Sequence, residues 1–347
     1  MKAWSGWMLL CGLVIASYRA IDPADPRWAA FDLHRYEAMR LAVPGFASVR
    51  APEAFRLAAP WLAALVGWGA VAYGSLFCCV ALLWRWLRVE GLTTTGAGVG
   101  VVLFSSSHFF AGEIAWDHYQ ACDALGFAAL LAAMCAVQAG RWRSFAAVLA
   151  VGCLVRETPI LAVPYAFAAA PRQWRRVLPA SMVGLAVLCA LHTLVPHDGG
   201  LTLPEAVRAF APTKLSAVVL ARDAGAFAPT GLVPLVAPGP TRAVLRLEHA
   251  VLLAAVLVAA LAGADIERLM MPCAPVVLLM VAAVAERWPA PHRIALVVLG
   301  IVGSAHHNMT RWPLPSRTWT AAITLLTTAL AVGVAIVAQR DTRTTRR

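Results

Sequence analysis

Long apolar runs, separated by short polar segments, make up almost the whole chain. The runs are continuous rather than alternating, which is typical of transmembrane helices and not of the strands of a membrane barrel. They predict an all-α, polytopic integral membrane protein with about ten to twelve transmembrane helices in a single domain, residues 1–347. The predicted spans lie at about 3–18, 69–87, 93–111, 118–139, 143–155, 158–170, 177–195, 224–238, 243–263, 266–285, 292–306 and 318–338.

Three of these runs depart from an ordinary span. Residues 3–18 are short for a span but long for a signal-peptide core, and we interpret them as an uncleaved first span, with cleavage of residues 1–20 as the alternative. Residues 143–170 have arginines on both sides, at 141 and 143 and at 172, 175 and 176, and so favour an in-and-out pair of short or re-entrant helices, each about 20 Å long. The proline-rich run at 224–238 is kept because the topology needs it.

Composition excludes a soluble protein. Hydrophobic residues make up 61% of the 347 positions and charged residues 14%, against roughly a quarter charged in soluble domains. The eight cysteines all fall in apolar segments without CxxC spacing, so a zinc site or a disulfide framework is not expected.

The net charge of +11 reflects topology rather than nucleic-acid binding. Arginines gather in alternate short loops and in a basic tail at 339–347, as the positive-inside rule requires when both termini are cytoplasmic. The expected location is the cell inner (plasma) membrane. The first loop, residues 19–68, then lies outside with amphipathic or juxtamembrane helices, and a candidate site at that end faces the periplasm.

Three arginines run against this rule, because Arg56, Arg156 and Arg268 fall on the predicted outer side. Arginine stays charged and binds phosphate through two parallel hydrogen bonds, so a phosphate group at the outer face would explain them. The alternative is internal salt bridges, with Arg156–Glu157 and Glu267–Arg268 as the adjacent pairs.

The segment FDLHRYEAMR, residues 31–40, is charged and suited to a helix. Asp32, Arg35, Tyr36 and Met39 share one helical face, and His34 lies off it. Asp32 is equally well explained as a helix cap or as a general base that takes a proton from an acceptor hydroxyl.

Further ionisable residues collect at the predicted outer ends of the spans, where such residues indicate function. A divalent metal held by Asp117, His118 and Asp123, or by His306 and His307, is the less favoured alternative to a site without cofactors. The other outer residues are His108, Glu113, Glu157, His192, His197 and Asp198.

Several stretches resemble the GT-C superfamily of membrane glycosyltransferases, which take sugars from polyprenyl-phosphate carriers at the outer membrane face. They are FDLHRYEAMRLAVPGF, PEAFRLAAPWLAALV, WDHYQACDALGFAALLAAM, LVRETPILAVP and GADIERLMMPCAPVVLL. The resemblance implies that Asp32 is the catalytic carboxylate of the first loop, that Glu157 is a second acidic residue and that Arg268 contacts the carrier phosphate. The family often has paired acidic residues in this loop, whereas here Asp32 stands alone until Glu37.

The expected function is transfer of a sugar from a polyprenyl-phosphate donor to a lipid or glycan acceptor, with membrane lipid and no nucleic acid as partners. Asp32 and Glu157 are the expected catalytic residues. A transporter or lipid flippase, which would carry charges near the bilayer midplane and internal repeats, is the main alternative. A non-catalytic membrane subunit is the third. The expected substrate-binding residues are Tyr36, Arg56, His108, Asp117, Arg156 and Arg268.

Overall fold

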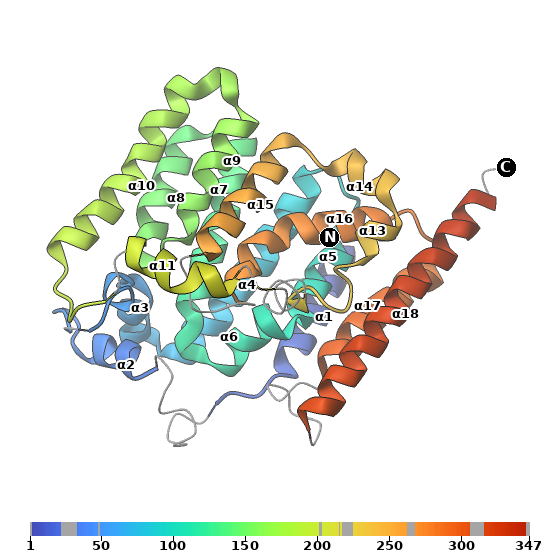
Figure 1. Ribbon diagram of the computed structural model, residues 1–347, viewed down its shortest axis with the longest axis horizontal. Helices are drawn as coiled ribbons and strands as arrows, with labels where there is room; N and C mark the ends of the chain where they lie inside the picture. Colours follow the sequence, from blue (N-terminus) through green and yellow to red (C-terminus); the bar gives the residue numbers. More distant parts are fainter. Residues whose placement is uncertain are drawn as a thin grey trace.

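The computed structural model describes residues 2–21, 33–47, 49–200, 203–214, 216, 225–261, 268–305 and 316–344. These residues are mostly helical, and an isolated β bridge joins Val49 and His197. The predicted all-α class is confirmed. Figure 1 shows the helices side by side, with α10 (Trp174–Leu194) at one edge and α18 (Arg317–Thr344) at the other.

Three helices form the centre of the core: α4 (Trp68–Val89), α5 (Thr94–Ser106) and α7 (Ala121–Gln138). α4 packs against both of the others. α5 is buried from Gly96 to Ser106, which agrees with a helix that is apolar on all sides.

Small residues in α5 let its neighbours approach closely. α1 (Lys2–Ala16) crosses α5 at Gly98, where a Cβ atom would lie only 2.2 Å from the Trp7 ring. Close contact through small residues is a common way for apolar helices to associate in lipid.

A short helical pair lies between α7 and α10. It consists of α8 (Trp142–Val155) and α9 (Ala162–Ala169), joined through the 3-10 helix η5 (Thr158–Leu161). The sequence prediction of two short arms is confirmed, since the fourteen residues of α8 extend about 21 Å. The chain breaks at Arg156, whose backbone is extended, and therefore turns inside the packed protein.

The C-terminal half completes the core, with α16 and α17 packed on α5, α15 on α9, and α18 on α17. The predicted span at 224–238 is wrong, because its described part from residue 225 is a turn that contains Pro229, followed by a four-residue helix with Pro234 in its first turn. The helices of this half are α13 (Val233–Val236), α14 (Pro238–Val244), α15 (Leu247–Ala260), η7 (Arg268–Cys273), α16 (Ala274–Ala285) and α17 (Ala290–Ala305).

The described part of the first loop contains helices, as predicted. Its helix α2 (Leu33–Leu41) buries Leu33, Tyr36 and Met39, and the half-buried Arg35 lies one turn before Met39, in agreement with the predicted face. Asp32 lies outside the described residues. The other short elements at this end are η2 (Glu53–Phe55), α3 (Ala58–Val66), η3 (His108–Gly112), α6 (Glu113–Trp116), η4 (His118–Gln120) and α11 (Leu203–Lys214).

Within the described residues, four helical segments are long and apolar enough to cross a membrane: 68–89, 118–138, 171–194 and 318–342. Two bent pairs would raise the number to six, 94–106 with 108–116 at 48° and 238–244 with 247–260 at 95°. The structure thus supports four to six of the ten to twelve predicted spans, and most of the other runs form apolar helices of 10–17 residues.

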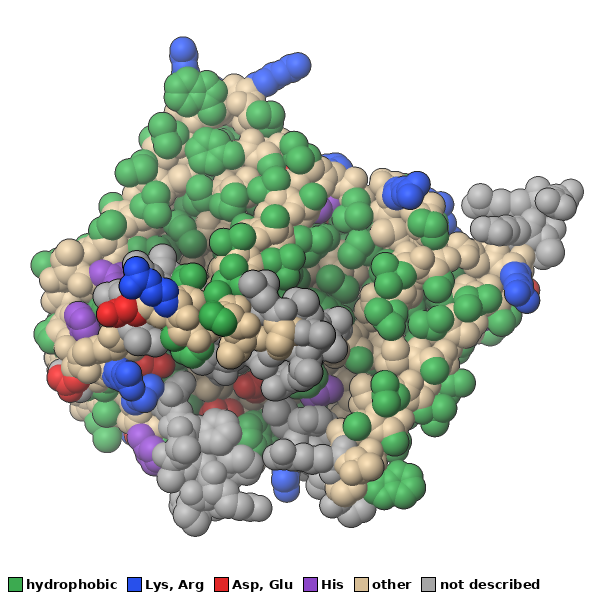
Figure 2. Space-filling model, in the orientation of Figure 1, with side chains coloured by type: hydrophobic (Ala, Val, Ile, Leu, Met, Phe, Trp, Pro, Cys, Tyr) green, Lys and Arg blue, Asp and Glu red, His purple; other side chains and the backbone are tan. Residues whose placement is uncertain are grey.

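The surface fits this interpretation. Figure 2 shows hydrophobic side chains spread over α10 and α18, where Leu194 and Leu325 are 77% and 72% exposed. Acidic, basic and histidine side chains gather instead over the end of the molecule that holds α2 and α3. Apolar side chains that face outward over whole helices are suited to lipid rather than to water.

Candidate functional site

Six buried or half-buried polar side chains meet at the N-terminal end of α7. They come from α2, the segment after η2, α7 itself and the break between α8 and η5. We call them the arginine cluster. Its members are Tyr36, Arg56, Cys122, Asp123, Arg156 and Glu157.

Arg56 connects the first loop to the short helical pair. Only 8% exposed, it donates from Nη1 to the Tyr36 hydroxyl at 2.8 Å, and its Nη2 lies 3.7 Å from Glu157 Oε2. Its Nε meets no acceptor within the described part of the chain. Arg56 therefore keeps hydrogen-bond donors that a further anion could use.

Arg156 forms a buried ion pair with Asp123 of α7. The two side chains are 10% and 1% exposed. Gly126, one turn further along α7, leaves room for this contact, since a Cβ atom there would lie 3.2 Å from Arg156 Cβ. The pair fixes the break after α8 against α7.

The Tyr36 hydroxyl lies at the centre of the cluster. Besides Arg56, it has the Cys122 sulfur 3.3 Å away, and that sulfur is 3.7 Å from Asp123 Oδ1. Burial raises the pKa of Tyr36 strongly, although the charge of Arg56 opposes the shift. The hydroxyl is therefore neutral and serves as a hydrogen-bonding group.

Glu157 is the member most open to the surroundings, with 38% of its side chain exposed. Loss of contact with water acts to raise its pKa, but the positive charges of Arg56 and Arg156 outweigh this effect and hold the pKa below its ordinary value. The carboxylate is ionised at neutral pH. The positive charges of Arg56 and Arg156 balance the negative charges of Asp123 and Glu157.

Aromatic rings border the cluster on the side of α10. The Phe55 ring lies 3.9 Å from the His192 ring and 5.3 Å from the His197 ring, measured between centroids. His192 also helps to keep the pKa of Glu157 low. The bridge between Val49 and His197 holds the first loop at this end.

Two of the predicted site residues have other surroundings. Asp117 is 1% exposed, and its carboxylate accepts the backbone N–H of Tyr119 at 3.1 Å, so it caps η4. His108 is 4% exposed on η3, with its ring 3.9 Å from Phe109. No described contact joins either of them to the arginine cluster.

The side chains of two other predicted residues lie outside the described part of the structure. Asp32 precedes the described part of α2. Arg268 begins η7, but the structure describes only its backbone.

The sequence prediction missed two members of the cluster and one pairing. Cys122 was expected to be a buried apolar filler, and Asp123 was considered only as a metal ligand. The suggested salt bridge between Arg156 and Glu157 is wrong as a direct pair: Arg156 contacts Asp123, and Glu157 lies beside Arg56. Asp123 in the first turn of an otherwise apolar helix was the available signal.

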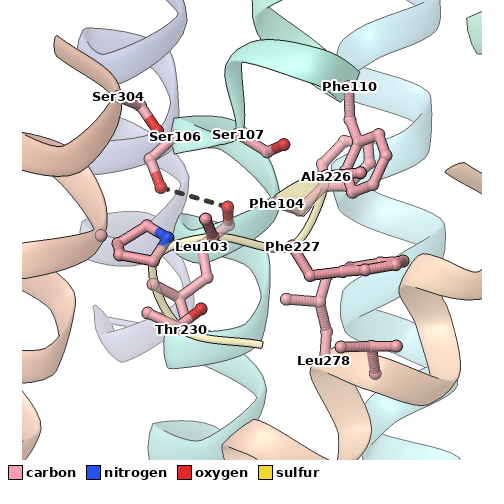
Figure 3. A pocket seen from close by; sticks show the side chains of 14 residues that line it. Leu103, Phe104, Ser106, Ser107, Phe110, Ala226, Phe227, Thr230, Leu278 and Ser304 are labelled. Atoms are coloured by element: carbon pink, nitrogen blue, oxygen red, sulfur yellow. Dashed lines mark hydrogen bonds between the residues drawn. The ribbon is translucent and has the colours of Figure 1, made fainter. Parts of the chain in front are cut away.

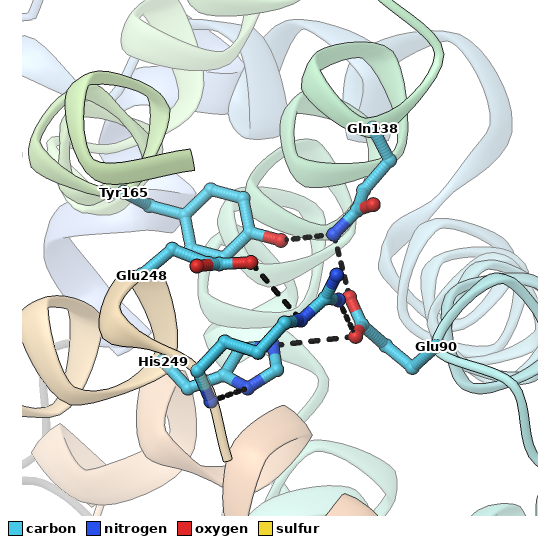
Figure 4. A network of polar contacts seen from close by, with 6 residues as sticks. Glu90, Gln138, Tyr165, Glu248 and His249 are labelled. Atoms are coloured by element: carbon cyan, nitrogen blue, oxygen red, sulfur yellow. Dashed lines mark hydrogen bonds and ion pairs between the residues drawn. The ribbon is translucent and has the colours of Figure 1, made fainter. Parts of the chain in front are cut away.

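A second polar network lies at the opposite ends of α4 and α7 (Figure 4). The Glu90 carboxylate accepts from Gln138 at 2.6 Å, contacts the Arg246 guanidinium and lies 3.4 Å from His249 Nε2. Gln138 also donates to the Tyr165 hydroxyl at 2.7 Å. The sequence predicts mostly arginines at this end. The buried network around Glu90 was not predicted, because the position of a residue in a loop does not show whether its side chain is buried.

This Glu90 network has a clear structural role. His249 Nδ1 accepts the backbone N–H of Arg246 at 3.2 Å, so the ring proton sits on Nε2 and faces Glu90. The arrangement caps the start of α15 and ties it to the ends of α4 and α7.

A small cavity lies between α5, α17 and the segment around Thr230 (Figure 3). The hydroxyls of Ser107 and Ser304 line it and have no described hydrogen-bond partner. Its free volume of about 20 Å³ suits one water molecule and is too small for a sugar.

The described residues contain no group of three or more histidine, cysteine, aspartate or glutamate side chains placed to hold a metal ion. His306 and His307 lie outside these residues. Comparison with known proteins finds no matching family model, no matching curated protein and no matching solved structure.

Proposed function

We propose that the chain is a multi-pass membrane enzyme of GT-C type. It transfers a sugar from a polyprenyl-phosphate donor to a lipid or glycan acceptor on the periplasmic face of the cell inner membrane. The observation that carries this proposal is Arg56, which is 8% exposed, has an unused Nε donor and reaches its described carboxylate partner, Glu157, only at 3.7 Å. A buried arginine is costly in so apolar a chain, and one with spare donors is suited to hold an anion.

The chemistry follows from the charges of the cluster. Arg56, supported by Arg156, binds the donor phosphate and stabilises it as the bond from the anomeric carbon to the phosphate oxygen breaks. The acceptor oxygen forms the new bond to that carbon, and the electron pair of the old bond leaves with polyprenyl phosphate. A carboxylate takes the acceptor proton. The resemblance assigns this step to Asp32, with Glu157 as the second, half-exposed carboxylate.

The position of the clusters favours this proposal over a transporter. A transporter is expected to hold its charged residues near the middle of its spans. The arginine cluster and the Glu90 network lie instead at opposite ends of α4 and α7. Asp123 and Gln138, which belong to the two groups, are separated by about 22 Å of helix.

Lipid-linked sugars in a strain that lacks the gene test the proposal. Mass spectrometry is expected to show one polyprenyl-phosphate sugar accumulating, with its glycan or glycolipid product missing. The wild-type gene and Glu90→Gln, a buried-carboxylate control at the other end, should restore the product, whereas Asp32→Asn, Arg56→Gln and Arg268→Ala should not. Restoration by all three variants at normal protein levels would show that the site is not catalytic.

A further inference from the structure

A basic hollow opens at the turn between α7 and α8, at the other end of α8 from the arginine cluster. Its volume is about 540 Å³. Its lining includes three arginines and a tryptophan. The residues that line it are Gly140, Arg141, Trp142, Arg143, Ser144 and Arg176.

The three guanidinium groups come from the starts of two helices. Arg141 and Arg143 flank the first residue of α8, and Arg176 lies in the first turn of α10. All three side chains are exposed, and none has an acidic partner within the described part of the chain. The first turn of α8 also contains no acidic residue. The hollow therefore carries three positive charges without internal compensation.

Contacts between the two helix starts fix its shape. Trp142 Nε1 donates to Gln173 Oε1 at 2.9 Å and so ties the start of α8 to the residue before α10. Next to Gln173, the Trp174 ring is 51% exposed and lies under the Arg175 guanidinium at 5.6 Å. Tryptophans and arginines at the ends of apolar helices are typical of the level of lipid headgroups.

We propose that this hollow binds the phosphate of an anionic phospholipid headgroup. Arginine forks match the oxygens of a phosphate, and basic pockets between helix ends are suited to anionic headgroups. The position also fits, because the predicted topology places this turn on the cytoplasmic side. The positive-inside rule by itself accounts for the positive charge of this turn. It does not account for three arginines from two helices that line one hollow, which provides space for one headgroup.

The loop between α16 and α17 provides a matched control. It lies on the same predicted side and carries Arg287, with Arg293 following in the first turn of α17, yet neither arginine lines the hollow. Nonspecific attraction to a charged membrane would involve both loops, whereas a headgroup site involves only the hollow.

Native mass spectrometry of the full chain, stripped of lipid in detergent, tests the proposal. The added probes are phosphatidylglycerol, phosphatidylcholine and inorganic phosphate. We expect phosphatidylglycerol to bind more tightly than the other two. Each arginine near the surface contributes about 1 kcal/mol, or about fivefold, so replacing Arg141, Arg143 and Arg176 by glutamine should weaken binding about a hundredfold.

Two further proteins make the result decisive. Arg287→Gln with Arg293→Gln should leave phosphatidylglycerol binding unchanged. A variant with lysine at the three hollow positions keeps the charges and should retain much of the binding, which would show that substitution at these positions does not unfold the protein. Equal binding of phosphatidylglycerol and phosphatidylcholine, or an equal loss in the control, would overturn the proposal. Inorganic phosphate that binds as tightly as phosphatidylglycerol would assign the hollow to a soluble anion and overturn the lipid assignment. Sugar transfer does not enter this measurement, so its outcome is independent of the proposed function.

Discussion

The ion pair between Asp123 and Arg156 holds the break after α8 against α7, and Asp123→Asn removes its negative charge at nearly constant size. The substitution leaves Arg156, with a side chain 10% exposed, facing a neutral amide. Removing one partner of a buried ion pair typically costs about 3–5 kcal/mol, because the remaining charge stays desolvated. The slight exposure of Arg156 allows some hydration, so we expect a loss of about 3 kcal/mol.

Replacing both partners separates this cost from the value of the pair itself. Asp123→Leu combined with Arg156→Met leaves no unpaired charge and fills similar volume, so its stability should lie within about 1 kcal/mol of the wild type. The coupling energy between the sites is then at least about 2 kcal/mol.

Equilibrium unfolding of the purified protein in detergent micelles, followed by tryptophan fluorescence, measures these differences. A loss below about 1 kcal/mol for Asp123→Asn would mean that the two side chains do not form a buried pair. A double variant as unstable as the sum of Asp123→Leu and Arg156→Met would also refute the reasoning, since it would indicate that each side chain acts alone.

Three further predictions use the same unfolding measurement. Tyr36→Phe removes the acceptor that Arg56 reaches at 2.8 Å and should cost about 1.5–3 kcal/mol; a change below about 0.5 kcal/mol would contradict that hydrogen bond. Gly98→Ala places a methyl group against the Trp7 indole ring and should lower the free energy of unfolding by about 1–3 kcal/mol. The control Gly74→Ala, with nothing within 4 Å, should be neutral or stabilising. Equal effects of the two substitutions would argue against the close crossing of α1 and α5. The lowered pKa of Glu157 stabilises the fold at neutral pH, and this contribution is lost as the pH falls below 4.5 through the folded-state pKa; Glu157→Gln should flatten the acid side of the stability profile, and an unchanged profile would contradict the shift.

The sequence predicts helix positions well where a run has no internal break. The run expected at 69–87 is α4, residues 68–89, and the run at 318–338 lies within α18. The run at 93–111 instead bends by 48° at Ser107, where the backbone becomes extended. Hydropathy averaged over the run does not register such a bend, because Phe104 before it and Phe109 and Phe110 after it keep the run apolar.

Part of the candidate site was also predictable. The positive-inside rule identified Arg56 and Arg156 as exceptions on one predicted side, and the structure brings them together around Glu157. Their actual pairing was not predictable. One sequence does not say which helix packs beside α7, so Asp123 could not be matched to Arg156. Nor does it show that Tyr36 accepts a hydrogen bond from Arg56 or that Arg35 lies 3.3 Å from Glu53.

The release of polyprenyl phosphate in a purified system tests the proposed transfer most directly. Proteoliposomes containing the chain would receive the lipid extract of a strain that lacks the gene, which supplies the accumulated donor and its acceptor. We expect the wild-type protein to consume the polyprenyl-phosphate sugar and release polyprenyl phosphate, Arg56→Gln to release almost none, and Glu90→Gln to match the wild type. Release by Arg56→Gln at the wild-type rate, or no release by a folded wild-type protein, would contradict the role assigned to the arginine cluster.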